Sequence, residues 1–240
     1  MPEPQCSAAA EEVLQNVDAR LMPDQYDYLS HPITADKVSL VLKMLPNDKA
    51  TGIDSLPYEF WKWLSDVGKY CTPEYQTENP FNMIACLTTV FNDIESHGAE
   101  PRTGFSDGWL CPLYKKKDCC KIESYHPITL LNRDYKIFTK ILSLCLAKTA
   151  PDVIYPNQAG FIQGCSIMDQ IKLTQMILNY AEAEKLDGAI IALDQEKAYD
   201  KIAHDYLWKV LDHFNFPPHF INTVKALYSH AETLVIINGL

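Results

Sequence analysis

Apolar residues recur every three or four positions in several stretches of the chain, and prolines separate these stretches. This spacing predicts amphipathic helices, each with one side against a core. Thr34 is expected to cap a helix that Pro46 ends. The apolar stripes within 134–149 and 168–184 are both expected to face the core. The predicted helices lie before Pro23, from Thr34 to Leu45, from Pro57 through Leu64, and at 81–94, 134–149, 168–184, 204–214 and 217–230.

Three apolar runs are short and predict strands. The run at 109–114 ends in a cluster of lysines at 115–117, which predicts a strand pair, or a strand and loop, with the lysines at the turn. The run at 188–193 predicts a buried strand. A second strand is expected at 233–237, where Asn238-Gly239 is a common hairpin turn. The pattern as a whole predicts a helix-rich, mixed α/β fold of the α+β type.

The composition supports a folded protein with an uneven charge distribution. Hydrophobic residues make up 47% of the chain and charged residues 22%, which excludes a disordered chain. No apolar run approaches the ~20 residues of a membrane span, and no basic-then-apolar leader begins the sequence, so we expect a soluble intracellular protein. The net charge is −10, yet residues 102–148 hold nine bases and four acids. This basic segment is compatible with nucleic-acid contact or with an ordinary solvated face.

The eight cysteines form no recognisable framework. No Cys-x-x-Cys pair occurs, and nothing indicates an oxidising compartment. Cys111, Cys119, Cys120 and His126 cluster loosely in the sequence, so zinc is conceivable. Their spacing matches no structural zinc pattern, and adjacent cysteines rarely bind one ion together. The sequence therefore favours reduced, structural thiols over a zinc site.

Asp194 directly follows the predicted buried strand at 188–193. Side chains at the carboxyl ends of strands commonly enter a functional site. With Glu196 and Asp200 close by, Asp194 could hold a hard cation through oxygen ligands. The alternative is that Asp194 caps the next segment and that its neighbours are solvated or salt-bridged surface charges.

The residues around Asp194 also belong to a longer pattern. The block at 191–202 reads Ile-Ala-Leu-Asp-Gln-Glu-Lys-Ala-Tyr-Asp-Lys-Ile. This block and three earlier segments resemble the reverse transcriptases of non-LTR (LINE-type) retrotransposons, and among these they are similar to fungal elements. The last block resembles their motif A. The four segments, in family order, are Lys-Ala-Thr-Gly-Ile-Asp at 49–54, Ser-Tyr-His-Pro-Ile-Thr-Leu-Leu-Asn at 124–132, Asn-Gln-Ala-Gly-Phe-Ile-Gln-Gly-Cys-Ser at 157–166 and the last block at 191–202.

The resemblance implies specific roles for residues at the matching positions. Polymerases of this fold align a primer and a triphosphate with two divalent ions, Mg²⁺ or Mn²⁺. Asp194 would be the catalytic carboxylate and a metal ligand, helped by the backbone carbonyl of Gln195. The family's partners are an RNA template and a DNA primer. Three residues would bind the nucleotide and two glycines would lie in a loop near the template: Lys115, Lys116 and Tyr199, and Gly160 and Gly164.

Departures from the family pattern limit what the resemblance implies. His126 and Cys165 stand where the family has arginine, which removes two permanent phosphate donors. Thr51 and Ser55 also depart from the family's loop. The family's Ala-Asp-Asp box and thumb do not occur in the 240 residues. We therefore expect a fragment truncated after motif A, inactive alone, in which Mg²⁺ binds only weakly.

A division of the chain into two regions and two alternative functions complete these expectations. Residues 1–101 are expected to form a helical N-terminal region leading into the fingers, and residues 102–240 the fingers and the first, incomplete part of the palm. Within that palm, the run at 188–193 would be an unpaired edge strand. Whether the chain is an enzyme stays open at this point. The alternatives are a non-catalytic nucleic-acid-binding fragment that uses the 102–148 segment and a domesticated protein-interaction fragment.

Overall fold

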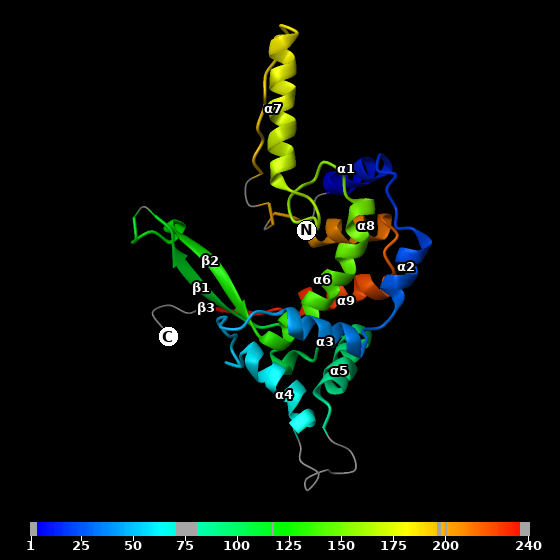
Figure 1. The fold of residues 1–240 in the computed structure, drawn as a ribbon, viewed down its shortest axis with the longest axis vertical. Coiled ribbons are helices and arrows are strands. Elements are labelled where there is room, and N and C mark those ends of the chain that lie inside the picture. The colour runs from blue at the N-terminus through cyan, green and yellow to red at the C-terminus, as the bar shows by residue number, and fades with distance from the viewer. Residues whose placement is uncertain (1–3, 71–80, 117, 196–197, 200, 236–240) are drawn as a thin grey trace. The chain divides into compact units, whose positions relative to one another are not determined.

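A computed structural model describes residues 4–70, 81–116, 118–195, 198–199 and 201–235 (Figure 1). Helices dominate these residues, and the few strands form one small sheet, so the expected helix-rich α+β fold is confirmed. The helices are α1 (Pro4–Gln15), α2 (Pro23–Ser30), α3 (Ala35–Met44), α4 (Tyr58–Tyr70), α5 (Met83–His97), α6 (Arg133–Val153), α7 (Ile167–Ala183), α8 (His204–His213) and α9 (Pro218–Ser229). The strands are β1 (Gly108–Tyr114), β2 (Tyr125–Leu131) and β3 (Thr233–Val235), and two short 3-10 helices are η2 (Pro101–Thr103) and η3 (Ile122–Ser124).

The chain divides into two compact units. Unit 1 contains Met1–Leu29 and Cys145–Pro218, and unit 2 contains Ser30–Leu144 and His219–Leu240. Both units therefore draw residues from each side of position 101. The division into 1–101 and 102–240 concerns polymerase subdomains, and it stays a prediction.

The core of unit 2 forms where α3, α5 and α6 present their apolar sides. Val38 of α3, Phe91 of α5 and Phe138 of α6 are fully buried, and the ring centroids of Phe91 and Phe138 lie 5.1 Å apart. Burial of such large side chains stabilises a fold by about 1.5–3 kcal/mol each. Thr34 caps α3, as expected, because its hydroxyl accepts the amide of Lys37 at 3.4 Å. The prediction that the stripe within 134–149 faces the core is confirmed.

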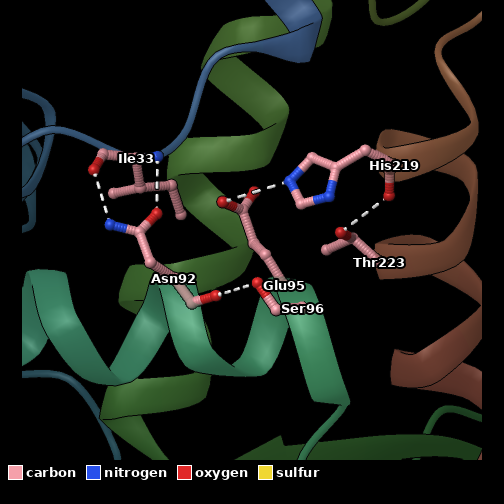
Figure 2. Close-up of polar contacts among 6 residues, drawn as sticks. All are labelled: Ile33, Asn92, Glu95, Ser96, His219 and Thr223. Carbon is pink, nitrogen blue, oxygen red and sulfur yellow. Dashed lines mark hydrogen bonds and ion pairs between the residues drawn. The ribbon is translucent and has the colours of Figure 1, made fainter.

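Polar side chains of α5 tie two distant segments to this core (Figure 2). The side chain of Asn92 accepts the amide of Ile33 at 2.8 Å and donates to the carbonyl of Ile33 at 2.9 Å. Nε2 of His219, in α9, lies 3.6 Å from Oε2 of Glu95. Figure 2 shows both contacts on one side of α5. They join the start of α3 and the start of α9 to the same helix.

The sheet of unit 2 has the strand order β2-β1-β3. Strands β1 and β2 are antiparallel, from Gly108 opposite Leu131 to Tyr114 opposite Tyr125, which confirms the strand pair predicted at 109–114. Strand β3 runs parallel to β1, with Gly108 opposite Thr233. The expected strand at 233–237 is therefore found at 233–235. Residues 236–237 and the Asn238-Gly239 turn lie outside the described residues.

Unit 1 is held together by contacts between its two chain segments. The amide of Leu21 donates to the carbonyl of Phe214 at 2.9 Å. His213, at the end of α8, lies with Nε2 2.8 Å from the carbonyl oxygen of Val17. The ammonium group of Lys148, in α6, sits 4.5 Å from the ring centre of Tyr28. These contacts place α2 against α6 and the segment after α1 against α8.

Two expectations about unit 1 are wrong. Helix α7 forms where the stripe predicted it, and Ser166 caps it by accepting the amide of Met168 at 3.2 Å. None of its residues is buried, however, and Ile177 is 57% exposed. The run at 188–193 is neither buried nor a strand, and Leu193 is 91% exposed. The apolar composition of this run is typical of residues that pack against another strand or helix. Among the described residues, no strand or helix packs against it.

None of the helices in the described part of the chain combines the length and the apolar character that crossing a bilayer would require.

Candidate functional site

The hairpin between β1 and β2 carries Lys115 and Lys116 at its tip. Strand β1 ends at Tyr114, and the amide of Lys115 donates to the carbonyl of Ser124 at 3.0 Å, which continues the pairing by one step. The rings of Tyr114 and Tyr125 lie 5.5 Å apart at this end of the strands. Both lysines are exposed. The structure therefore presents them at a turn, where the sequence predicted them, and Lys117 lies outside the described residues.

Asp194 and Gln195 follow the irregular segment at 188–193, after α7. Both are exposed, because the residues that precede them are not part of a sheet. Gln195 lines a cleft of about 800 Å³ whose walls come from α1, α8 and the segment before α8. Glu196, Lys197 and Asp200 lie outside the described residues, so the carboxylates that sequence reasoning grouped with Asp194 cannot be placed beside it. The lining residues are Ala9, Ala10, Val13, Gln195, Lys201, Ile202, Ala203, Asp205, Tyr206, Trp208 and Lys209.

Tyr199 meets the loop that contains Gly160 and Gly164. Its ring, 78% exposed, makes an edge contact with Phe161 at 6.3 Å between centroids. Phe161 is 95% exposed and has a φ of 63°, a left-handed conformation that costs energy in a residue other than glycine. Gly164 has a φ of 84°, which accounts for glycine there, whereas a Cβ at Gly160 would meet only the side chain of Gln158 at 3.4 Å. The contact between Phe161 and Tyr199 therefore joins the blocks at 157–166 and 191–202.

A contact that sequence reasoning did not single out joins the other two blocks. The side-chain oxygen of Asn132 accepts the amide of Asp54 at 3.2 Å, and its Nδ2 donates to the carbonyl of Gly104 at 3.3 Å. A Cβ on Gly52 would lie 2.4–2.6 Å from atoms of Asn132, so only glycine fits this approach. Both residues lie inside quoted blocks, at 49–54 and 124–132. The signal was therefore present in the sequence, although nothing in it indicated that the blocks touch.

Charged groups beside Asn132 are buried or half-buried. Arg133 is 2% exposed, and its guanidinium stacks 4.2 Å from the ring centre of Tyr58. Burial raises the pKa of Asp134, and the neighbouring carboxylate of Asp54 raises it further. Burial also lowers the pKa of Lys136, with a smaller contribution from Arg133. This end of α6 is therefore a packed, charged support for the loop at 52–54 and is not itself an open site.

The predicted site residues fall into two sets. Lys115 and Lys116 belong to unit 2, whereas Gly160, Gly164, Asp194, Gln195 and Tyr199 belong to unit 1. Within unit 1 the structure brings Tyr199 to Phe161, in the glycine-containing loop. Exposed lysines, exposed aromatic rings and an exposed carboxylate are groups that contact phosphates, bases and cations, respectively.

Comparison with known proteins decides the family. The sequence model described as reverse transcriptase (RNA-dependent DNA polymerase) matches residues 114–239, which include all seven predicted site residues. The chain belongs to the reverse transcriptase family. The matched residues contain three of the four blocks, so the resemblance to a reverse transcriptase is confirmed.

Two transposon proteins are similar to this reverse transcriptase chain. One, a transposon TX1 uncharacterized 149 kDa protein of Xenopus laevis, is 33% identical over 237 residues, which are 99% of this chain and 17% of the relative. The other is a probable RNA-directed DNA polymerase from transposon BS of Drosophila melanogaster. It is 25% identical over 235 residues, which are 97% of this chain and 24% of the relative. The chain spans about a fifth of the length of these relatives.

Proposed function

We propose that these 240 residues form the fingers and the first part of the palm of an RNA-directed DNA polymerase from a non-LTR, LINE-type retrotransposon. The observation that carries the proposal is the family match over 114–239, within which Asp194 stands in the block that resembles motif A. The similarity to two transposon proteins supports a mobile-element origin. The proposal also includes the division at residue 101 and a resemblance to fungal elements. The two relatives, from a frog and a fly, test neither of these.

Asp194 and the carbonyl of Gln195 would hold Mg²⁺ or Mn²⁺. Their donor atoms fit, because both ions prefer oxygen ligands and the carboxylate is exposed to solvent. Such an ion stabilises the charge that develops on transferring phosphates. A single carboxylate should bind it no better than roughly millimolar, since Mg²⁺ keeps most of its waters. Calorimetry on wild type and Asp194→Asn tests this, and a micromolar site lost in the variant would contradict it.

The remaining residues would contact nucleic acid and nucleotide. Lys115 and Lys116 offer two exposed ammonium groups to triphosphate or backbone phosphates. Tyr199 would close the sugar pocket, and its contact with Phe161 supports a position beside the loop of Gly160 and Gly164. That loop would lie near the template. The expected partners are an RNA template and a DNA primer.

A salt titration of binding to an RNA–DNA primer–template duplex tests the nucleic-acid role. Binding through phosphates weakens with salt, and each lost contact reduces the log–log slope by about 0.9. Lys115→Ala/Lys116→Ala should therefore give a slope shallower by roughly two and weaker binding at low salt. Lys43→Ala/Lys172→Ala is the matched control, because it removes two exposed lysines to which the resemblance assigns no nucleotide-binding role.

Two results of this titration would contradict the proposal. Absence of any affinity at low salt would favour the alternative of a protein-interaction fragment. Equal salt-dependence slopes for the two double variants would mean that Lys115 and Lys116 do not contact phosphates, although the chain still binds nucleic acid. In that case the basic 102–148 segment would contact the duplex through other groups.

Primer extension tests whether these 240 residues polymerise alone. Two-metal chemistry needs carboxylates in addition to Asp194, and the Asp-Asp dipeptide of the family does not occur in the 240 residues. We therefore expect no sustained incorporation on a poly(rA) template with an oligo(dT) primer, in Mg²⁺ or Mn²⁺. Sustained incorporation that Asp194→Ala abolishes would show that this expectation is wrong and that Asp194 is catalytic in the chain as it stands.

A further inference from the structure

The turn after β1 brings three potential metal ligands together. One ligand atom each from Asp118, Cys119 and Cys120 lie within 4.8 Å of one another, and all three residues are exposed. Among the residues that the structure describes, this is the one group of three or more histidine, cysteine or acidic side chains so arranged. The sequence disfavoured zinc here because the spacing matches no structural zinc pattern and adjacent cysteines rarely bind one ion together. The structure nevertheless brings the two sulfur atoms within 4.8 Å of each other. The structure adds this carboxylate as the third donor.

The backbone of this turn is held by its own hydrogen bonds. The amide of Cys120 donates to Oδ1 of Asp118 at 3.0 Å, and the amide of Lys121 donates to the carbonyl of Asp118 at 3.2 Å. The hydroxyl of Tyr125, on β2, donates to the carbonyl of Cys119 at 2.9 Å. These bonds fix the main chain while leaving both thiols exposed. Little ordering is then needed for an ion to bind, which lowers the entropy cost of binding.

We propose that Asp118, Cys119 and Cys120 bind a thiophilic divalent cation, such as Zn²⁺, through two thiolates and one carboxylate oxygen. Bond lengths of about 2.3 Å to sulfur and 2.0–2.2 Å to oxygen place the donors of a tetrahedral ion roughly 3.5–4 Å apart. The observed spacing, within 4.8 Å, needs only small side-chain rotations to reach this. Two metal–sulfur bonds form as the two thiol protons pass to solvent, and water occupies the fourth position.

This site differs in chemistry from the Mg²⁺ position proposed at Asp194. Thiolates select soft or borderline ions, whereas Mg²⁺ takes oxygen ligands. Asp118 belongs to unit 2 and Asp194 to unit 1. The inference therefore stands or falls independently of the polymerase function. An excess of Mg²⁺ should leave it unaffected.

Titration of the full chain with Cd²⁺, followed by the ultraviolet cadmium–thiolate absorption, tests the proposal. The titration uses reduced protein and a background in which four other cysteines are serine, so that they contribute no absorption. We expect one Cd²⁺ per chain, displaced by Zn²⁺ and not by Mg²⁺. The four background substitutions are Cys6→Ser, Cys71→Ser, Cys86→Ser and Cys165→Ser.

Single variants in this background separate the ligands. Cys119→Ser and Cys120→Ser should each reduce the absorption by about half and weaken binding at least about tenfold. Asp118→Asn should weaken binding while keeping the absorption, because oxygen does not contribute to it. Cys111→Ser, on β1, is the control and should change neither. Absorption that survives in Cys119→Ser/Cys120→Ser, or that is lost equally in Cys111→Ser, would overturn the proposal.

Discussion

Helices α6 and α7 carry similar apolar stripes but have opposite surroundings. Phe138 and Ile137 of α6 are fully buried against α5 and its neighbours, whereas no residue of α7 is buried. The same contrast separates the four blocks of the family resemblance. The blocks at 49–54 and 124–132 pack against each other through Gly52 and Asn132. The described residues of the blocks at 157–166 and 191–202 are largely exposed. An apolar stripe indicates which face of a helix is suited to packing, but it does not indicate which element packs against that face.

The largest expected difference is between substitutions of large apolar residues in the two helices. Phe138→Ala removes a fully buried ring and should lower the free energy of unfolding by about 3–5 kcal/mol. Ile177→Ala removes an exposed side chain from α7 and should change it by less than about 0.5 kcal/mol. Denaturant unfolding followed by circular dichroism measures both. A large loss for Ile177→Ala would mean that α7 is covered in solution, and the contrast between the helices would disappear.

Glycine substitutions should give an intermediate difference. Gly52→Ala places a Cβ 2.4–2.6 Å from Asn132, so the loop at 52–54 must shift, at a cost of about 1–3 kcal/mol. Gly188→Ala is the matched control from the exposed region, where an added Cβ has no atom within 4 Å. It should be neutral or slightly stabilising, because alanine restricts the unfolded chain. Equal effects in unfolding experiments would mean that the Gly52–Asn132 contact does not form in solution.

The smallest expected effect is a pH dependence inside the packed unit. Burial raises the pKa of Glu95, an effect that nearby His219 and Lys37 only partly offset. The folded chain then holds this proton at higher pH than the unfolded chain does, so stability falls as the pH rises from about 4.5 through the raised pKa. Glu95→Gln should remove this fall and be at least as stable as wild type above that window.

Unfolding curves across this pH range, with Glu184→Gln as control, measure the effect. Glu184 is exposed at the end of α7, so its variant should follow the wild-type curve. If the Glu95→Gln curve also runs parallel to wild type throughout, the carboxyl of Glu95 is solvated. The polar contacts of Figure 2 would then be looser than their geometry indicates.

The positions of the candidate site residues could be named from the sequence, and their binding and catalytic roles stay predictions. The turn lysines, the glycine-containing loop and the block around Asp194 all fall within the matched domain. The surroundings of Asp194 were not predictable. The apolar run at 188–193 becomes a buried strand only if other strands or helices pack against it, and the local sequence does not specify which ones. The contact of Asn132 with Gly52 was equally hidden. It joins residues 80 positions apart, and neither has a periodic pattern that reveals it.

The sequence by itself determined the helices, the strand before the lysine turn and the family. Helix spacing, the cap at Thr34 and motif order depend on residues near one another in the chain, so local rules suffice for them. The tertiary structure alone decided which stripes are buried, which glycines have no room for a side chain and which carboxyls have a raised pKa. Each of these depends on how many atoms from distant segments surround a group. That number sets both the hydrophobic stabilisation and the loss of solvation.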